Sequence, residues 1–193
     1  MMSSDEAIRE AISVLKVPSQ VRRLRTAPLP EGTPLLLAIA AGDPDAEKVA
    51  MSLTGRPVEL LREAAGFFIE QILLFPDADS YRMLGADKTS MSQELRNHMV
   101  LLMRWLHPDM DQTGEREHLA VRVLSAWEDL KSTERRSAYD AAHAASDAQN
   151  RARAPSAGSK KQPSHISRRP VVHGARPPAG GWLRSIVGMF SSR

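Results

Sequence analysis

Two histidines and two aspartates lie near the middle of the chain, and their side chains are of the types that bind metals or transfer protons. His98 precedes His107, which is followed by Asp109 and Asp111. A structural metal site usually needs four converging ligands, and a hydrolase needs a third group to orient its acid or base. The sequence supplies neither, and it has no phosphate-binding glycine loop and no Gly-x-Ser-x-Gly turn. We therefore predict that the protein is not an enzyme and holds no metal and no cofactor.

A proline between His107 and Asp109 determines where the preceding helix must end. Pro108 pushes His107 out of helical conformation, so the preceding helix should stop near Leu106. Its start is predicted at Ser90 or Ser92, because Ser90 has Gln93 three residues on, as in a capping box. One apolar stripe at helical spacing lies between these ends and consists of Leu95, Met99, Leu102 and Leu106.

A second amphipathic helix follows a polar loop that runs from Asp109 to Gly114. Glu115 and Glu117 are expected to open this helix. Because the connection is short, the two helices should form an antiparallel hairpin in which Leu102 faces Val123. The stripe of the second helix consists of Leu119, Val123, Ala126 and Leu130.

Shorter elements are predicted on both sides of the hairpin. Residues 80–84 read as a short helical turn that Gly85 closes. Ser132 is placed to cap a last helix, which holds Arg135, Arg136 and Tyr139.

Four motifs stand out in this region. They are Tyr81-Arg82-Met83-Leu84-Gly85, His107-Pro108-Asp109, Ala126-Trp127 with Leu130, and Arg135-Arg136-Ser137-Ala138-Tyr139-Asp140. With these motifs, residues 79–142, 64 of the 193 residues, resemble the J-domain family. The resemblance implies a four-helix domain whose second helix and His-Pro-Asp loop dock on a DnaK-type chaperone and stimulate the ATPase of that chaperone.

The resemblance also assigns roles to residues of this chain. His107, Pro108 and Asp109 would bind the partner, with Asp109 in a charge-assisted pair with a basic group. Arg96 and Arg104 are the basic residues that the second helix offers. The domain core would comprise Tyr81, Leu84, Leu95, Met99, Leu102, Leu106, Leu119, Val123, Ala126, Leu130 and Tyr139.

The second helix departs from the usual pattern of the family. It carries two basic residues where the family usually has a run of them, and Met110 follows the tripeptide where Lys is common. Electrostatic steering toward an acidic partner should therefore be weaker. Val100, Leu101 and Trp105 lie off the apolar stripe, so some of them are expected to pack on the N-terminal helices. The alternative function is a helical adaptor or scaffold whose J-like fold no longer couples to an ATPase.

The first 76 residues are expected to form an all-helical module that precedes the J-like region. Its first helix has Asp5 near its start and is ended by Pro18, and a loop is predicted from Val21 to Pro34. The run 35–40 could be a buried helix or a strand. The next helix is capped by Asp43 before Pro44 and ends at Gly55. A long amphipathic helix then runs from Val58 to Phe75, with Leu61, Ala65, Phe68 and Ile72 on one face.

Charge separates the chain into an acidic body and a basic tail. Residues 1–150 hold 17 basic and 23 acidic residues, whereas residues 151–193 hold nine basic residues and no acid. Residues 143–180 are predicted to be a disordered basic linker. Residues 181–193 form a short apolar amphipathic segment, which we expect to anchor the chain to a partner or to anionic lipid. The anchoring side chains would be Trp182, Leu183, Ile186, Val187 and Phe190.

Composition bears on partners and location. The chain has no cysteine, so neither disulfides nor thiolate metal sites can form. The tail has no aromatic residue before Trp182 for stacking on bases, so nucleic acid is not an expected partner.

The acidic N-terminus lacks the pattern of a signal peptide, and no apolar run is long enough to span a bilayer. We expect a cytoplasmic protein that can associate peripherally with the inner face of a membrane.

Overall fold

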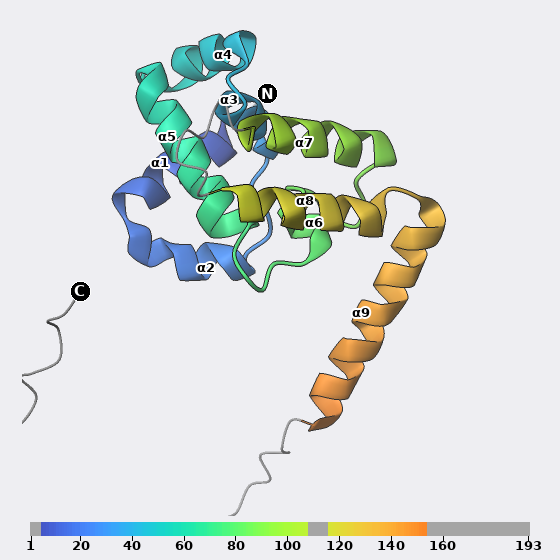
Figure 1. Ribbon diagram of the computed structural model, residues 1–193. Coiled ribbons are helices and arrows are strands. Elements are labelled where there is room, and N and C mark those ends of the chain that lie inside the picture. The colour runs from blue at the N-terminus through green and yellow to red at the C-terminus, as the bar shows by residue number, and fades with distance from the viewer. Residues whose placement is uncertain (1–4, 108–115, 154–193) are drawn as a thin grey trace, which may run out of the picture. The chain divides into compact units, whose positions relative to one another are not determined.

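The computed structural model of the chain describes residues 5–107 and 116–153. The chain divides into a unit of residues 1–154 and a unit of residues 155–193, so everything described lies in the first. Every regular element in the described ranges is helical, which confirms the predicted all-α class (Figure 1). The expected anchor residues 181–193 lie outside the described residues, as do Pro108 and Asp109.

The N-terminal helices pack around α3 (Thr33–Ala40) and α5 (Val58–Phe68). The helix α1 (Glu6–Lys16) contacts both of them through a face formed by Ala7, Ile8, Ala11 and Val14. α3 is apolar along nearly all of its length and is mostly buried, which is why periodicity alone could not separate a helix from a strand. The structure shows that the run is a helix.

The helix α4 (Pro44–Thr54) has the predicted start and end. A carboxylate oxygen of Asp43 accepts hydrogen bonds from the backbone N–H groups of Asp45 and Ala46, both at 3.0 Å. Gly55 ends the helix with a φ of +63°, a left-handed conformation that glycine adopts without steric cost.

The predicted helix from Val58 to Phe75 is interrupted. α5 passes into η2 (Ile69–Leu73), a turn of π-helix in which the N–H of Leu74 donates to the carbonyl of Ile69 at 2.9 Å. A π turn inserts one extra residue and rotates the following side chains around the axis. Leu73 and Leu74 are therefore buried, while Phe75 is only partly buried.

The predicted loop from Val21 onward is wrong over its first part. A 3₁₀ turn, η1 (Pro18–Gln20), leads into the helix α2 (Val21–Thr26). The arginine-rich sequence of α2 shows no apolar stripe, and Leu24 is its only buried residue. The hydrophobic pattern therefore gave no sign of a helix here. Tertiary contacts hold the helix instead, since Arg25 donates to the carbonyl of Gln71 at 2.8 Å.

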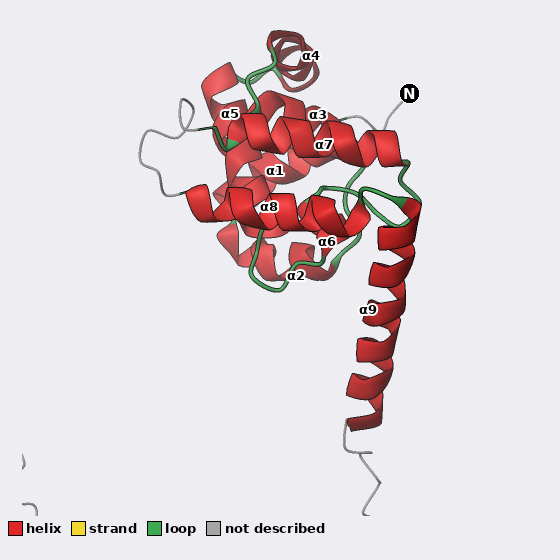
Figure 2. Cartoon of the chain, turned by 45° about the vertical axis from the view of Figure 1, so that its right-hand side comes forward, coloured by secondary structure: helices red, strands yellow, loops and turns green. Residues whose placement is uncertain are grey.

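The J-like segment, residues 79–142, contains α6 (Ser80–Met83), α7 (Ser92–Trp105), α8 (Glu117–Leu130) and the beginning of α9 (Thr133–Arg153). Figure 2 shows α7 and α8 side by side. Met99 and Tyr139 are partly buried against the core. The other residues proposed for the core are buried, namely Tyr81, Leu84, Leu95, Leu102, Leu106, Leu119, Val123, Ala126 and Leu130.

The predicted cap of α7 is wrong, whereas that of α9 is confirmed. Met91 precedes α7 and makes no side-chain cap, and Ser92 is the first residue of the helix. The hydroxyl of Ser90 instead accepts from the N–H of Asp87 at 3.4 Å, in the turn before the helix. At α9, the hydroxyl of Ser132 accepts from the N–H of Arg135 at 3.3 Å.

The last helix is longer than expected. α9 continues to Arg153, so residues 143–153, which were expected to belong to a linker, are helical. This stretch is rich in alanine, the residue with the highest helix propensity. None of the described helices is long and apolar enough to cross a membrane.

Candidate functional site

The His-Pro-Asp tripeptide lies in the connection between α7 and α8. α7 ends at Trp105, and the N–H of His107 donates to the carbonyl of Arg104 at 3.2 Å. α8 begins at Glu117, directly after Arg116. The described part of the site therefore consists of the ends of these two helices and the outer face of α7.

The outer face of α7 is exposed and carries little charge. Both Arg96 and Arg104 lie on it, together with Val100, which is 53% exposed. The positive charge of Arg104 also acts on Asp43, the residue that caps α4. The pKa of the Asp43 carboxyl is lowered mainly by the N–H groups of Ala46 and Asp45, and to a smaller degree by Arg104.

The helix α5 and the turn η2 contact both ends of the connection. The indole of Trp105 is 4% exposed and packs over Gly66, where an added Cβ would lie 3.7 Å from the ring. The guanidinium of Arg116 stacks 4.6 Å from the centre of the Trp105 ring and forms an ion pair of 2.7 Å with Glu70. Trp105 thus packs on an N-terminal helix, as its position off the stripe predicted.

The opening and closing motifs of the J-like segment bind each other. The hydroxyl of Tyr81 donates to the carboxylate of Asp140 and accepts from Nε of Arg136, each at 3.1 Å. Arg136 also donates to the carbonyl of Ser90 at 2.6 Å. The hydroxyl of Tyr139 accepts from the N–H of Ser80 at 2.8 Å. These bonds fasten α6 and α9 to the turn that leads into α7.

Two arginines of the J-like segment donate to carbonyl groups of the N-terminal module. Arg82 donates to the carbonyls of Leu24 and Ala27 at 2.6 and 2.7 Å. Arg122 donates to the carbonyls of Leu74 and Phe75. Carbonyls at helix ends lack partners within the helix, so both arginines act as caps contributed by a distant part of the chain. Sequence reasoning missed these roles because α2 and the π turn were not predicted.

His98, a candidate ligand in the sequence, is a buried residue of α7. Its side chain is 3% exposed, and Nδ1 lies 3.0 Å from the carbonyl oxygen of Leu84. Burial lowers the pKa of His98, which keeps the ring neutral at neutral pH. Over residues 5–107 and 116–153, no three His, Asp or Glu side chains are grouped so that they could hold a metal.

Comparison with known proteins bears on the same region. The chain is 35% identical over 72 residues to human DnaJ homolog subfamily C member 16, a match that covers 37% of this chain and 9% of that protein. It is 35% identical over 63 residues to the Curved DNA-binding protein of Coxiella burnetii, covering 33% of this chain and 20% of that protein. No protein-family model and no solved structure matches the chain. Over about a third of its length, the chain therefore resembles the J domain of DnaJ-related proteins.

Proposed function

We propose that the protein is a J-domain co-chaperone that stimulates the ATPase of a DnaK-type chaperone. The observation that carries the proposal is the position of His107-Pro108-Asp109. The tripeptide connects two helices that pack as a hairpin, inside the segment that resembles DnaJ-related proteins. The ATP and the hydrolytic groups belong to the partner, so the chain needs no catalytic residue of its own.

The residues of the site have separate tasks in this proposal. Pro108 sets the backbone that presents His107 and Asp109, and Asp109 pairs with a basic group of the chaperone. Arg96 and Arg104 approach an acidic surface of the chaperone from the exposed face of α7. Because that face offers two cations, electrostatic attraction contributes less to the encounter than it would with a longer basic run.

The test is a single-turnover ATPase assay with a DnaK-type chaperone from the same cell. The full chain should raise the rate of ATP hydrolysis above that of the chaperone alone, and saturably so. If no chaperone of the cell is stimulated, the proposal is wrong.

A helical adaptor without ATPase coupling is the second candidate. The feature that favours it is the outer face of α7, where Val100 is largely exposed between the two arginines. An adaptor would bind a partner protein without changing its ATPase rate. Binding measured beside the ATPase assay separates the two functions.

We also propose that the protein is cytoplasmic and reaches the inner face of a membrane through its C-terminus. The basis is the sequence of the tail, in which an acid-free basic stretch leads into the apolar segment of residues 181–193. Trp182 and Phe190 would lie at the level of the lipid headgroups.

A further inference from the structure

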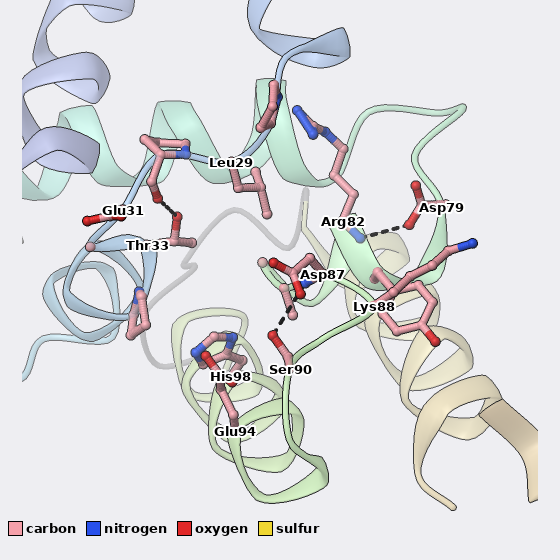
Figure 3. Close-up of a pocket in the computed structure, with 17 residues that line it drawn as sticks. Leu29, Glu31, Thr33, Asp79, Arg82, Asp87, Lys88, Ser90, Glu94 and His98 are labelled. Atoms are coloured by element: carbon pink, nitrogen blue, oxygen red, sulfur yellow. Dashed lines mark hydrogen bonds between the residues drawn. The ribbon is translucent and has the colours of Figure 1, made fainter. Parts of the chain in front are cut away.

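Cavities lie between the N-terminal module and the J-like segment at both ends of α7. The cavity at the first turns of α7 has a volume of about 580 Å³. Figure 3 shows that its charged side chains are of both signs, with Arg82 and Lys88 beside four carboxylates. Such a lining selects no single class of ligand. The cavity at the last turn of α7 has a volume of about 390 Å³ and a simpler lining.

This second cavity, the Trp105 pocket, is built by both parts of the chain. Leu15, Ala40 and Phe67 line it from α1, α3 and α5, and Trp105 lines it from the end of α7. Its volume is within the range of about 300–1,000 Å³ that is typical of ligand pockets. The N-terminal module thus contributes most of the apolar surface of a pocket that lies beside the connection between α7 and α8.

The charged side chains that line the Trp105 pocket balance each other. They are two arginines and two glutamates. Arg62 forms an ion pair of 2.6 Å with Glu47, and Arg116 forms one of 2.7 Å with Glu70. Because both cations already have a carboxylate partner, the lining favours an uncharged apolar ligand over an anion.

The indole N–H of Trp105 is a donor without an acceptor among the described residues. The side chain is 4% exposed, and a Cβ added at Gly66, which also lines the pocket, would lie 3.8 Å from Nε1. In the described ranges, the fully buried side-chain nitrogen without a partner is Nε of Arg82, so Nε1 of Trp105 is not fully enclosed. A ligand in the pocket that brings an acceptor would satisfy this donor.

Gly66 leaves the indole uncovered on the pocket side. Glycine inside a helix is destabilising relative to alanine. The space around Gly66 does not require a glycine, because an added Cβ would make only ordinary contacts with Trp105, at 3.7 and 3.8 Å. The chain therefore keeps an aromatic surface and a donor open at a cost in helix stability.

We propose that the Trp105 pocket binds an apolar side chain of the DnaK-type chaperone, next to a backbone carbonyl that accepts from the indole N–H. The inference rests on the proposed function, because it requires the chaperone to be held at the HPD loop. His107 follows Trp105 by two residues, which span at most about 7 Å, so a protein bound at His107 is within reach of the pocket. The apolar contact offsets the small number of cations on α7.

The test measures stimulation of the chaperone ATPase as a function of the concentration of the full chain, with direct binding to the immobilised chaperone measured beside it. Phe67→Ala removes an apolar wall of the pocket. Gly66→Ala covers the indole with a methyl group and should preserve or raise stability, because alanine favours the helix. The matched control is Ser52→Ala, which also favours a helix but lies at an exposed position of α4 that does not line the pocket. Urea denaturation checks the folding of each variant.

We expect Phe67→Ala to raise the half-maximal concentration about tenfold, as for a residue at the centre of an interface, and Gly66→Ala to raise it about fivefold by overlap with the bound side chain. The maximal rate should stay that of wild type, because the HPD loop is unchanged, and Ser52→Ala should have no effect. The ratio to wild type should persist at high salt, since apolar contacts are not screened.

Stimulation by wild type together with unchanged half-maximal concentrations in both pocket variants would overturn the inference and leave the proposed function standing. A wild-type chain that neither binds nor stimulates the chaperone would overturn both.

Discussion

At the scale of single residues, His98 is a polar side chain that the fold buries in the core. Its side chain was a candidate metal ligand in the sequence, yet it is enclosed in the structure and contacts the carbonyl of Leu84. Burial lowers the pKa of the ring below its ordinary value of 6.5. The unfolded chain therefore binds more protons than the folded chain once the pH falls through that value.

We predict that the protein loses stability as the pH is lowered from neutral to about 5.5. In this range the His98 ring of the unfolded chain takes up a proton, whereas the buried ring of the folded chain stays neutral, so acid favours the unfolded chain. In the variant His98→Gln, this part of the pH dependence should disappear. The free energy of unfolding is measured by urea titration at both pH values. His118→Gln, at an exposed position of α8, is measured in parallel as the loss of a histidine outside the core. An unchanged slope in His98→Gln would contradict the assignment.

Leu102 tests the packing of the hairpin. Leu102 and Val123 are both fully buried, on helices that contact each other. Leu102→Ala should lower the free energy of unfolding by about 2–5 kcal/mol, because it leaves a cavity in a closed core. Val100→Ala, on the exposed side of the same helix, should change it by no more than about 0.5 kcal/mol. Similar denaturation midpoints for the two variants would show that the register is wrong.

At the scale of elements, the ion pair between Glu70 and Arg116 joins η2 to the start of α8. We predict that Glu70→Gln lowers the stimulation of a DnaK-type ATPase about two- to fivefold, a loss comparable to that of a part-exposed ion pair. The reason is that Arg116 marks the end of the connection that carries the HPD loop. The free energy of unfolding should change by less than about 1 kcal/mol.

The control for this experiment is Glu128→Gln, which removes the ion pairs of Glu128 with Lys131 and Arg135 at the far end of α8. The double variant Glu70→Lys with Arg116→Glu should restore part of the stimulation by re-forming the pair. Full stimulation by Glu70→Gln would mean that η2 does not position the connection.

Most helices could be predicted from the sequence, because caps, closing glycines and apolar stripes mark them locally. Asp43 before Pro44, Gly55 after α4, and the stripes of α7 and α8 each determine an element from neighbouring residues. The errors have non-local causes. α2 depends on contacts with residues from Gln71 to Arg82, and the π turn of η2 changes which residues are buried after Phe68. Neither effect leaves a periodic pattern in the sequence.

The candidate site was predictable only in part, for the same reason. His107-Pro108-Asp109 is recognisable as a motif, and its place between α7 and α8 follows from two apolar stripes and a proline. The contacts of Glu70 and Gly66 with the ends of that connection join residues far apart in the sequence. No spacing rule connects such residues before the fold is known.

At the scale of the whole molecule, the N-terminal module and the J-like segment share one hydrophobic core. Fully buried residues such as Phe68 of α5 and Leu102 of α7 belong to the same cluster. Arg82 and Arg122 add hydrogen bonds between the two parts. The boundary predicted between residues 76 and 79 is thus crossed by both apolar and polar contacts, and we expect the two parts to unfold together.

The tail provides a prediction of its own. The full chain should float with anionic vesicles, whereas a chain that ends at Pro178 should not, because the truncation removes the apolar segment. Binding should weaken as salt is added, since screening reduces the attraction between basic residues and anionic lipid. Neutral vesicles are the control. Equal flotation of the two chains would rule out a membrane anchor in residues 181–193.

The central claim is that the HPD loop couples this protein to a DnaK-type chaperone. The most direct measurement compares wild type, His107→Gln and Asp109→Asn in the single-turnover ATPase assay, with circular dichroism and urea denaturation as checks on folding. Wild type should stimulate hydrolysis, and both variants should lose stimulation while their free energy of unfolding changes by about 0.5 kcal/mol or less. Variants that stimulate as well as wild type would contradict the account.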